Sequence, residues 1–297
     1  MRLSRAGGRR LVAGVPTLWL LLLFLVPFLI VFRISFSEVR LAIPPYTPLI
    51  SWHHGSPSLD LHWSAYRFLF TDSLYVSSYL YSLKVAAVST LCCLLIGYPM
   101  AYAIARSAPS TRSVLLMLIV LPFWTSFLLR VYAWIGLLNN NGVINNVLLY
   151  LGLIKHPLVL MQTDFAVYIG IVYSYLPFMI LPLYANLEKH DLALLEAAAD
   201  LGARPLRAFV RITLPQSLPG ILAGSLLVFI PAVGEYVIPT LLGRTDQLMI
   251  GRVLSDEFFE NRDWPVASAV AILILLLLVI PIMLFQRAQR RELEAAK

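Results

Sequence analysis

The stretch DLALLEAAADLGARPLRAFVRITLP, residues 191–215, separates two long apolar runs of the chain. It begins with Asp191, a residue type that caps the N-terminus of a helix. Gly202 is the residue expected in the left-handed conformation that ends a helix, and Pro205 suits the first turn of another. The stretch therefore predicts two short helices joined at Gly202. The apolar residues that share one face of the first helix are Leu192, Leu195 and Ala199.

Away from this stretch the composition is that of a membrane protein. Apolar residues make up 59% of the 297 residues and charged residues only 13%. Soluble globular proteins carry about 45–50% apolar and about 25% charged residues. These deviations exclude a soluble enzyme, a disordered chain and a nucleic-acid-binding domain, although the isoelectric point is near 9.5.

Six apolar runs are long enough to cross a bilayer, which takes roughly 20 helical residues. They are continuously apolar rather than alternating, so they predict helices rather than barrel strands. The fold class expected is an all-α polytopic membrane protein with six transmembrane helices in one domain, residues 1–297. The first run follows several arginines, but it is too long for a signal peptide and no small-residue cleavage site follows it, so we expect a retained span. The predicted spans are about 11–35, 79–105, 113–138, 164–187, 212–240 and 265–286.

Basic residues are distributed unequally between the two sets of loops. One face, with both termini and the loops at 106–112 and 188–211, holds fourteen lysines and arginines, and the other holds seven. Positive loops stay on the cytoplasmic side, so both termini are expected there. The opposite face carries a net charge of about −2 and would weakly favour a cationic solute.

The outer loops and the prolines add local expectations. The proline-rich segment 33–78 excludes a regular helix where the prolines cluster, and the apolar stretch after Asn139-Asn140-Asn141-Gly142 favours an interfacial or re-entrant helix. Two interpretations of the span prolines stay open: kinks around a pathway, or the ordinary frequency of proline in membrane helices. These prolines are Pro27, Pro99, Pro122, Pro177, Pro182, Pro219, Pro231, Pro239 and Pro281.

The 191–215 stretch also carries a recognisable spacing, E-A-A-x3-G-x9-I-x-L-P. It resembles the EAA motif of permease subunits of bacterial ABC importers, and it lies between the fourth and fifth of six predicted spans. In that family the short helix docks into a cleft of the ATPase subunit, so the resemblance implies that residues 188–214, here called the coupling loop, contact an ATPase. The residues that the resemblance implies for this contact are Glu196, Ala197, Ala198, Gly202, Ile212, Leu214 and Pro215.

A narrower resemblance covers most of the chain. Segments such as LPFWTSFLLRVYAWIGLL at 121–138 and FIPAVGEYVIPTLLG at 229–243 are similar to the first permease subunit of spermidine/putrescine importers, especially the putrescine type. The resemblance implies a type I ABC importer permease fold and alternating access. It also implies a dimer of ATPase subunits that uses ATP and magnesium, a second similar permease completing a heterodimeric pore, a periplasmic polyamine-binding protein, and a place in the bacterial inner membrane among lipid.

The chain lacks the motifs of an enzyme. A P-loop needs a lysine after a glycine, and none of Lys84, Lys155, Lys189 and Lys297 follows one. No catalytic or metal-ligating set is expected, and no cofactor is expected in this chain. The alternatives are a permease for another small cationic or organic solute and, from a different class, a membrane-embedded enzyme or a receptor.

Two ionisable residues, Arg130 and Glu235, interrupt the spans. Charges within a membrane are costly and face the bundle interior or water. Three interpretations stay open: Glu235 contacts a polyammonium solute, Glu235 pairs with Arg130, or both lie at the outer interface. The aromatic residues that could line a solute path by cation–π contact are Trp124, Tyr173, Tyr175 and Tyr236, with Tyr132 and Trp134 equally suited to an interfacial belt.

Overall fold

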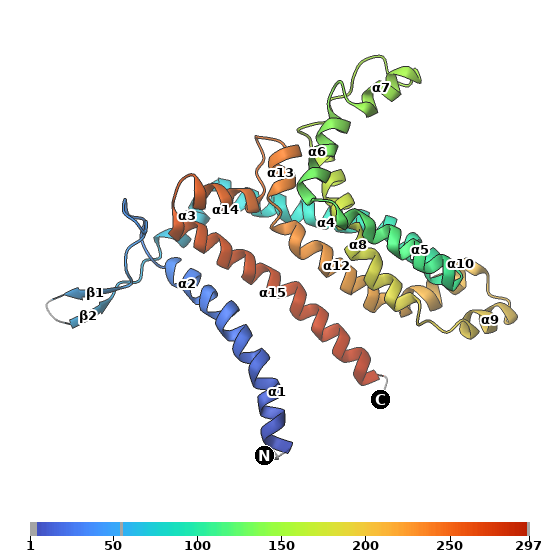
Figure 1. The fold of residues 1–297 in the computed structure, drawn as a ribbon, viewed down its shortest axis with the longest axis horizontal. Helices are drawn as coiled ribbons and strands as arrows, with labels where there is room; N and C mark the ends of the chain where they lie inside the picture. Colours follow the sequence, from blue (N-terminus) through green and yellow to red (C-terminus); the bar gives the residue numbers. More distant parts are fainter. Residues whose placement is uncertain (1–4, 54–55, 296–297) are drawn as a thin grey trace. The chain divides into compact units, whose positions relative to one another are not determined.

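The computed structural model describes residues 5–53 and 56–295. Almost all of these residues are helical, which confirms the all-α fold class (Figure 1). The exception is a short antiparallel hairpin of β1, Ile50–His53, and β2, Ser56–Leu59, in the proline-rich segment 33–78. The chain forms two compact units, Met1–Val76 with Leu254–Leu276, and Ser77–Val253 with Leu277–Lys297.

The first unit is held together by aromatic side chains. The ring of Phe36 packs edge-on against Trp63, with the ring centres 5.0 Å apart, and also contacts Tyr66. Tyr75 donates a hydrogen bond of 2.6 Å to Glu257 Oε1. The elements of this unit are α1 Arg5–Leu20, the π-helical turn η1 Leu21–Leu25, α2 Val26–Ile34, α3 Ser64–Thr71, and parts of α4 Ser73–Arg106, α14 Ile250–Phe259 and α15 Trp264–Ala295.

The second unit is centred on two helices that run side by side, α8 Asp164–Leu187 and α12 Leu218–Val233. The two helices approach closely because α12 has a glycine at the contact: a β-carbon on Gly224 would lie 2.8 Å from Met179 Sδ of α8. The remaining elements are α5 Pro109–Val120, the 3-10 turn η2 Leu121–Trp124, α6 Phe127–Leu138, α7 Val143–Tyr150, α9 Ala193–Asp200, α10 Pro205–Ala208, the π-helical turn η3 Phe209–Thr213, α11 Leu214–Gln216 and α13 Val237–Leu242.

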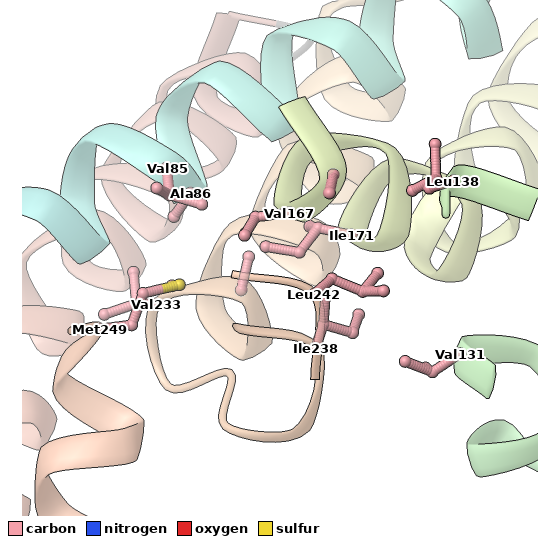
Figure 2. Packing of buried hydrophobic residues seen from close by; sticks show 12 residues of the cluster. Val85, Ala86, Val131, Leu138, Val167, Ile171, Val233, Ile238, Leu242 and Met249 are labelled. Atoms are coloured by element: carbon pink, nitrogen blue, oxygen red, sulfur yellow. The ribbon is translucent and has the colours of Figure 1, made fainter. Parts of the chain in front are cut away.

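One core cluster joins α8 to the short helix α13. Val167 and Ile171 of α8 lie beside Ile238 and Leu242 of α13 (Figure 2). A β-carbon on Gly170 would meet Ile238 Cγ2 at 2.7 Å, so the two helices are in direct contact. This packing fixes where α13 starts.

The six predicted spans are not all confirmed as single helices. Val12–Ile34, α4 and α8 are long and apolar enough to cross a membrane. The predicted third and fifth spans are each bent, by 89° between Pro109–Trp124 and Phe127–Tyr150 and by 62° between Pro205–Gln216 and Leu218–Val233. The sixth lies within α15, Trp264–Ala295, in which the apolar part Trp264–Ile280 is shorter than a full span among the residues searched.

Local backbone chemistry explains the two bends. Pro122 opens the 3-10 turn η2, and Thr125 and Ser126 after it are extended, so the helical hydrogen bonds stop there. Pro215 and Pro219 flank the 62° bend. By contrast α4 and α8 continue as single helices through the prolines inside them. The predicted helix after Asn139-Asn140-Asn141-Gly142 is present as α7.

Candidate functional site

The coupling loop folds as its residue types predict. Helix α9 ends before Gly202, whose φ is +76°, and α10 begins at Pro205. Asp191 Oδ1 accepts the N–H of Ala193 at 3.0 Å and so satisfies one free donor at the start of α9. The two short helices joined at Gly202 are therefore confirmed.

The inner side of the coupling loop packs on aromatic residues. Phe209 lies edge-on against Tyr98 and Tyr102, with ring centres 5.7 and 6.1 Å apart. A cavity of about 210 Å³ lies beside these rings, and Leu195 and Ala199 form part of its wall. Of the predicted apolar face, Leu195 is half-buried, whereas Leu192 and Ala199 are exposed, Ala199 at the cavity wall.

The outer side of the coupling loop presents large apolar side chains. Leu201 and Leu206, on either side of the Gly202 turn, are 88% and 75% exposed. An exposed apolar cluster of this kind is typical of a surface that contacts another protein. Among the residues implied by the EAA motif, Glu196, Ala197, Gly202, Leu214 and Pro215 are exposed, and Ala198 and Ile212 are half-buried.

The base of the coupling loop is tied to the neighbouring loop by an ion pair that the sequence did not indicate. Arg112 Nη1 donates to Glu188 Oε1 at 2.6 Å. Its Nη2 donates to the carbonyl oxygens of Ala105 and Ser107 at 3.0 and 3.3 Å. Arg112 thus joins the end of α4 to the end of α8. No local pattern marks this pair, because its members are 76 residues apart.

Between α12 and α13 the chain leaves the helix for three residues, Gly234, Glu235 and Tyr236, here called the helix break. Glu235 is only 7% exposed. Its Oε1 accepts the N–H groups of Val237 and Ile238 at 3.1 and 3.3 Å, and its Oε2 accepts the hydroxyl of Tyr175. The carboxylate therefore has three donors. A carboxylate offers about four acceptor positions, so one remains.

The helix break lies at mid-depth of the bundle. Tyr175 is the twelfth of the 24 residues of α8, about 17 Å from either end at the usual rise of 1.5 Å per residue. Its hydrogen bond places Glu235 against the middle of α8 rather than against its outer end. A broken helix with a buried polar group at this depth is the arrangement that transporters use for solute sites.

Arg130 does not pair with Glu235. Among the described residues Arg130 forms no ion pair, and the central carbon of its guanidinium lies 5.2 Å from the ring centre of Phe123 and 5.7 Å from that of Phe127. Its Nε is buried without a hydrogen-bond partner. Ring contacts of this kind contribute roughly 0.5–2 kcal/mol, whereas an arginine at the bilayer centre costs about 2.5 kcal/mol or more.

A second cavity lies beside Arg130. It has a volume of about 340 Å³, and Arg130, Trp134 and Tyr173 form part of its wall. The rings of Trp134 and Tyr173 pack edge-on with centres 5.6 Å apart. Tyr173 therefore accompanies Arg130, whereas Tyr175 bonds Glu235.

The other predicted aromatic residues are accessible. Trp124, at the bend before α6, is 77% exposed, and Tyr236, in the helix break, is 42% exposed. The predicted pathway residues therefore form two neighbouring sets along α8, one around Glu235 and one around Arg130. Among the described residues no three His, Cys, Asp or Glu side chains come together in a way that could hold a metal ion.

Comparison with known proteins finds one family that matches nearly the whole chain. The family described as binding-protein-dependent transport system inner membrane component matches residues 10–294. The spermidine/putrescine transport system permease protein PotB of Haemophilus influenzae is 39% identical over 274 residues, which cover 92% of this chain and 91% of that protein. PotB of Escherichia coli strain K12 is 43% identical over 219 residues, 74% of this chain and 80% of that protein.

The fold matches a solved structure along its whole length. A bacterial alginate ABC transporter, crystallised in complex with an alginate pentasaccharide-bound periplasmic protein, superposes with a TM-score of 0.73. The match covers 98% of both chains at 16% sequence identity. At this identity the likeness concerns the fold alone.

Proposed function

The chain belongs to the family of inner-membrane components of binding-protein-dependent transport systems, and we propose that it conducts a polyamine, putrescine in preference to spermidine. It is a permease subunit of an ABC importer and a multi-pass membrane protein, not an enzyme. The observation that carries the choice of solute is the 39% identity to a spermidine/putrescine permease over 92% of the chain.

The chemistry of the helix break supports a cationic solute. Glu235 is a buried carboxylate without a cation of its own, since its partners are a hydroxyl and two amide groups. A polyamine carries at least two ammonium groups, each with three donors. The free acceptor position of Glu235 offers one ammonium group part of the hydration that it loses in the membrane. Tyr236 in the helix break and Tyr173 on α8 supply aromatic faces for cation–π contact. Trp124, at the bend before α6, supplies another.

Arg130 has a different role in the pathway from Glu235. A guanidinium repels ammonium groups, so it cannot hold the solute as Glu235 does. It lies beside Tyr173 and limits where along α8 a polyamine rests. We therefore place the solute at Glu235 and Tyr175 and treat Arg130 as a border of the path.

The coupling loop supplies the link to ATP. A pair of ATPase subunits, which use ATP and magnesium, would receive the exposed side of the loop with Glu196, Gly202 and Leu201 at its surface. ATP binding would close the cytoplasmic side and open the outer side, as alternating access requires. A second, similar permease would complete the pore, and a periplasmic polyamine-binding protein would deliver the solute.

The orientation of the chain follows from its charges. Fourteen basic residues on one set of loops against seven on the other support an orientation with both termini in the cytoplasm. Reporter fusions near Glu260 are expected to behave as periplasmic, and fusions at the carboxyl terminus as cytoplasmic. Lys297, the last residue, lies outside the described residues. A periplasmic carboxyl terminus would contradict this orientation.

Competition uptake tests the choice of solute. The assembled importer in membrane vesicles is given labelled putrescine with an excess of unlabelled putrescine, spermidine or an amino acid. We expect putrescine to compete at the lowest concentration, spermidine at a higher one, and amino acids not at all. Displacement by amino acids and not by polyamines would refute the proposal.

Substitution of Glu235 tests the site. Glu235→Gln keeps the shape of the side chain and removes its charge, so we expect uptake to fall several-fold while the ATPase still copurifies. If Glu235 instead served Arg130, the double variant Arg130→Gln with Glu235→Gln would regain both yield and uptake. We expect no such recovery, because the two residues share no ion pair in the structure.

A further inference from the structure

Among the residues that the structure describes, Arg130 has no carboxylate as a counter-charge. Its guanidinium faces the rings of Phe123 and Phe127, and its Nε is buried with no acceptor within hydrogen-bond distance. Aromatic faces compensate a cation less well than an oxyanion, which also accepts its hydrogen bonds. The arrangement is therefore incomplete in electrostatic terms.

This chain has no carboxylate to offer at that depth. Glu235 is the only acidic residue inside a predicted span and away from its ends. Its oxygens already accept the hydroxyl of Tyr175 and two N–H groups of α13. The missing anion must come from outside the chain.

The depth of Arg130 excludes the phosphate of a lipid headgroup. On either side of Arg130, Phe123 packs against Phe178 and Trp134 packs against Tyr173. Tyr173 and Phe178 are each nine residues from the nearer end of α8, which is about 13 Å at the usual helical rise. Headgroup phosphates lie beyond the hydrocarbon, at the ends of such a helix.

The surroundings of the guanidinium fit a protein side chain. The cavity of about 340 Å³ beside Arg130 has room for a carboxylate, and its other walls include Leu129, Ala133 and Leu137. Leu129 is 67% exposed and Trp124, at the bend, is 77% exposed. An exposed apolar rim around one cation is complementary to an apolar helix that carries one acidic residue.

We infer that Arg130 forms an ion pair with a carboxylate of the second permease subunit, which enters the cavity beside it within the membrane. The inference rests on the proposed function for the presence of that subunit. A guanidinium binds a carboxylate through two parallel hydrogen bonds, a geometry that lysine cannot reproduce. The pair would fix how the two halves of the pore meet.

Charge reversal in both subunits tests the ion pair. The complete importer is expressed with Arg130→Glu, and each Asp or Glu within the spans of the second permease is changed to Arg in turn. We expect Arg130→Glu to lower copurification of the second permease at least tenfold and one reversed residue to restore it to within twofold. Arg130→Lys should lie between, because it keeps the charge and loses the double hydrogen bond.

Other results would overturn the inference. One is that Arg130→Glu copurifies the second permease at the wild-type level. The other is that Arg130→Glu loses the second permease and no carboxylate reversed to arginine restores it, although Arg130→Gln yields a monodisperse chain. A phospholipid held by the wild type and lost in Arg130→Gln, as seen by native mass spectrometry with subunit association unchanged, would assign the site to lipid instead.

Polyamine uptake is measured separately, so that the two proposals fail independently. If one carboxylate changed to arginine restores copurification, but the importer takes up no polyamine, the ion pair stands and the choice of solute is refuted. Normal polyamine uptake and normal assembly with Arg130→Glu would remove the ion pair and leave the choice of solute standing.

Discussion

The coupling loop and the helix break each contain a glycine between two helices and an acidic residue, but their surroundings differ. A β-carbon on Gly202 would meet nothing within 4 Å, and Glu196 beside it is exposed. The helix break is instead packed against from outside: a β-carbon on Gly251 of α14 would lie 2.4 Å from the carbonyl oxygen of Gly234, although one on Gly234 itself would meet nothing within 4 Å. Glu235 in the break is 7% exposed. The loop is shaped by its own backbone, whereas the break is shaped by packing.

This difference indicates what each region is for. The coupling loop packs through its inner side only, so its outer face is free, and apolar residues such as Leu201 are available there for a partner. A break that needs neighbours can position a charge within the membrane, where an imprecise site would be costly. Substitutions should therefore affect assembly at the loop and folding at the break.

The largest expected effect is that of Gly251→Ala. The added β-carbon meets the backbone of Gly234 and Glu235, which cannot rotate away, so the start of α14 and the helix break cannot both keep their places. We expect little monodisperse protein and no uptake. The matched control is Gly234→Ala, since a β-carbon there meets nothing within 4 Å. Equal yields from the two variants, measured by size-exclusion chromatography, would show that packing does not shape the break.

The next effect is that of Gly202→Asp in the coupling loop. A non-glycine residue in the left-handed region costs roughly 1–2 kcal/mol, and the charge lies where the ATPase is proposed to dock. We expect normal insertion and yield, with ATPase copurification and uptake reduced more than tenfold. Gly202→Asn is the control, because asparagine tolerates this conformation and adds no charge. Full uptake with Gly202→Asp would remove the docking role.

The same contrast explains how far the sequence was predictive. The coupling loop could be predicted in detail because Asp191, Gly202 and Pro205 act on their immediate neighbours. The six apolar runs predicted the fold class, and Pro122 left a kink open as one interpretation. A hydropathy count cannot see that Thr125 and Ser126 are extended, so the size of the bend, 89°, was not predicted.

The helix break was predictable only in part. The sequence marked Glu235 as a costly charge inside a span, but not the partner of that charge. Tyr175 is 60 residues away and reaches Glu235 because α8 packs against α13 through Gly170. No periodicity in the sequence specifies that contact, so the pairing with Arg130 stayed open until the fold was known.

A smaller effect is expected from Tyr175→Phe, which tests how the break holds its charge. The variant removes one hydrogen bond to an ionised group, a loss of about 1.5–3 kcal/mol, while Val237 and Ile238 still hold Oε1. We expect a lower melting temperature and a several-fold fall in uptake. Tyr173→Phe is the control, because its ring packs on Trp134 and not on Glu235. Identical behaviour of the two variants would contradict the assignment of Tyr175.

The smallest effect concerns Arg112 and Glu188 at the base of the coupling loop, and it should be asymmetric. The ion pair is partly exposed, so its coupling energy in a double-mutant cycle should be about 0.2–1 kcal/mol. Arg112 also donates to the carbonyls of Ala105 and Ser107, which close the end of α4 and have lost their helical partners. Glu188→Gln removes only the charge, whereas Arg112→Gln also frees those carbonyls and should cost about 1 kcal/mol more.

That asymmetry separates two roles for the Arg112 tie. If it only holds the coupling loop, the two single variants should lower uptake equally, because both release Glu188. If its main role is to close α4, Arg112→Gln should lower the melting temperature more than Glu188→Gln does, and Arg112→Lys should recover part of the difference. Thermal unfolding of the four members of the cycle, followed together with uptake, decides between them. We expect the second result, since the guanidinium of Arg112 makes one hydrogen bond to Glu188 but two to carbonyls of α4 and of the residue after it.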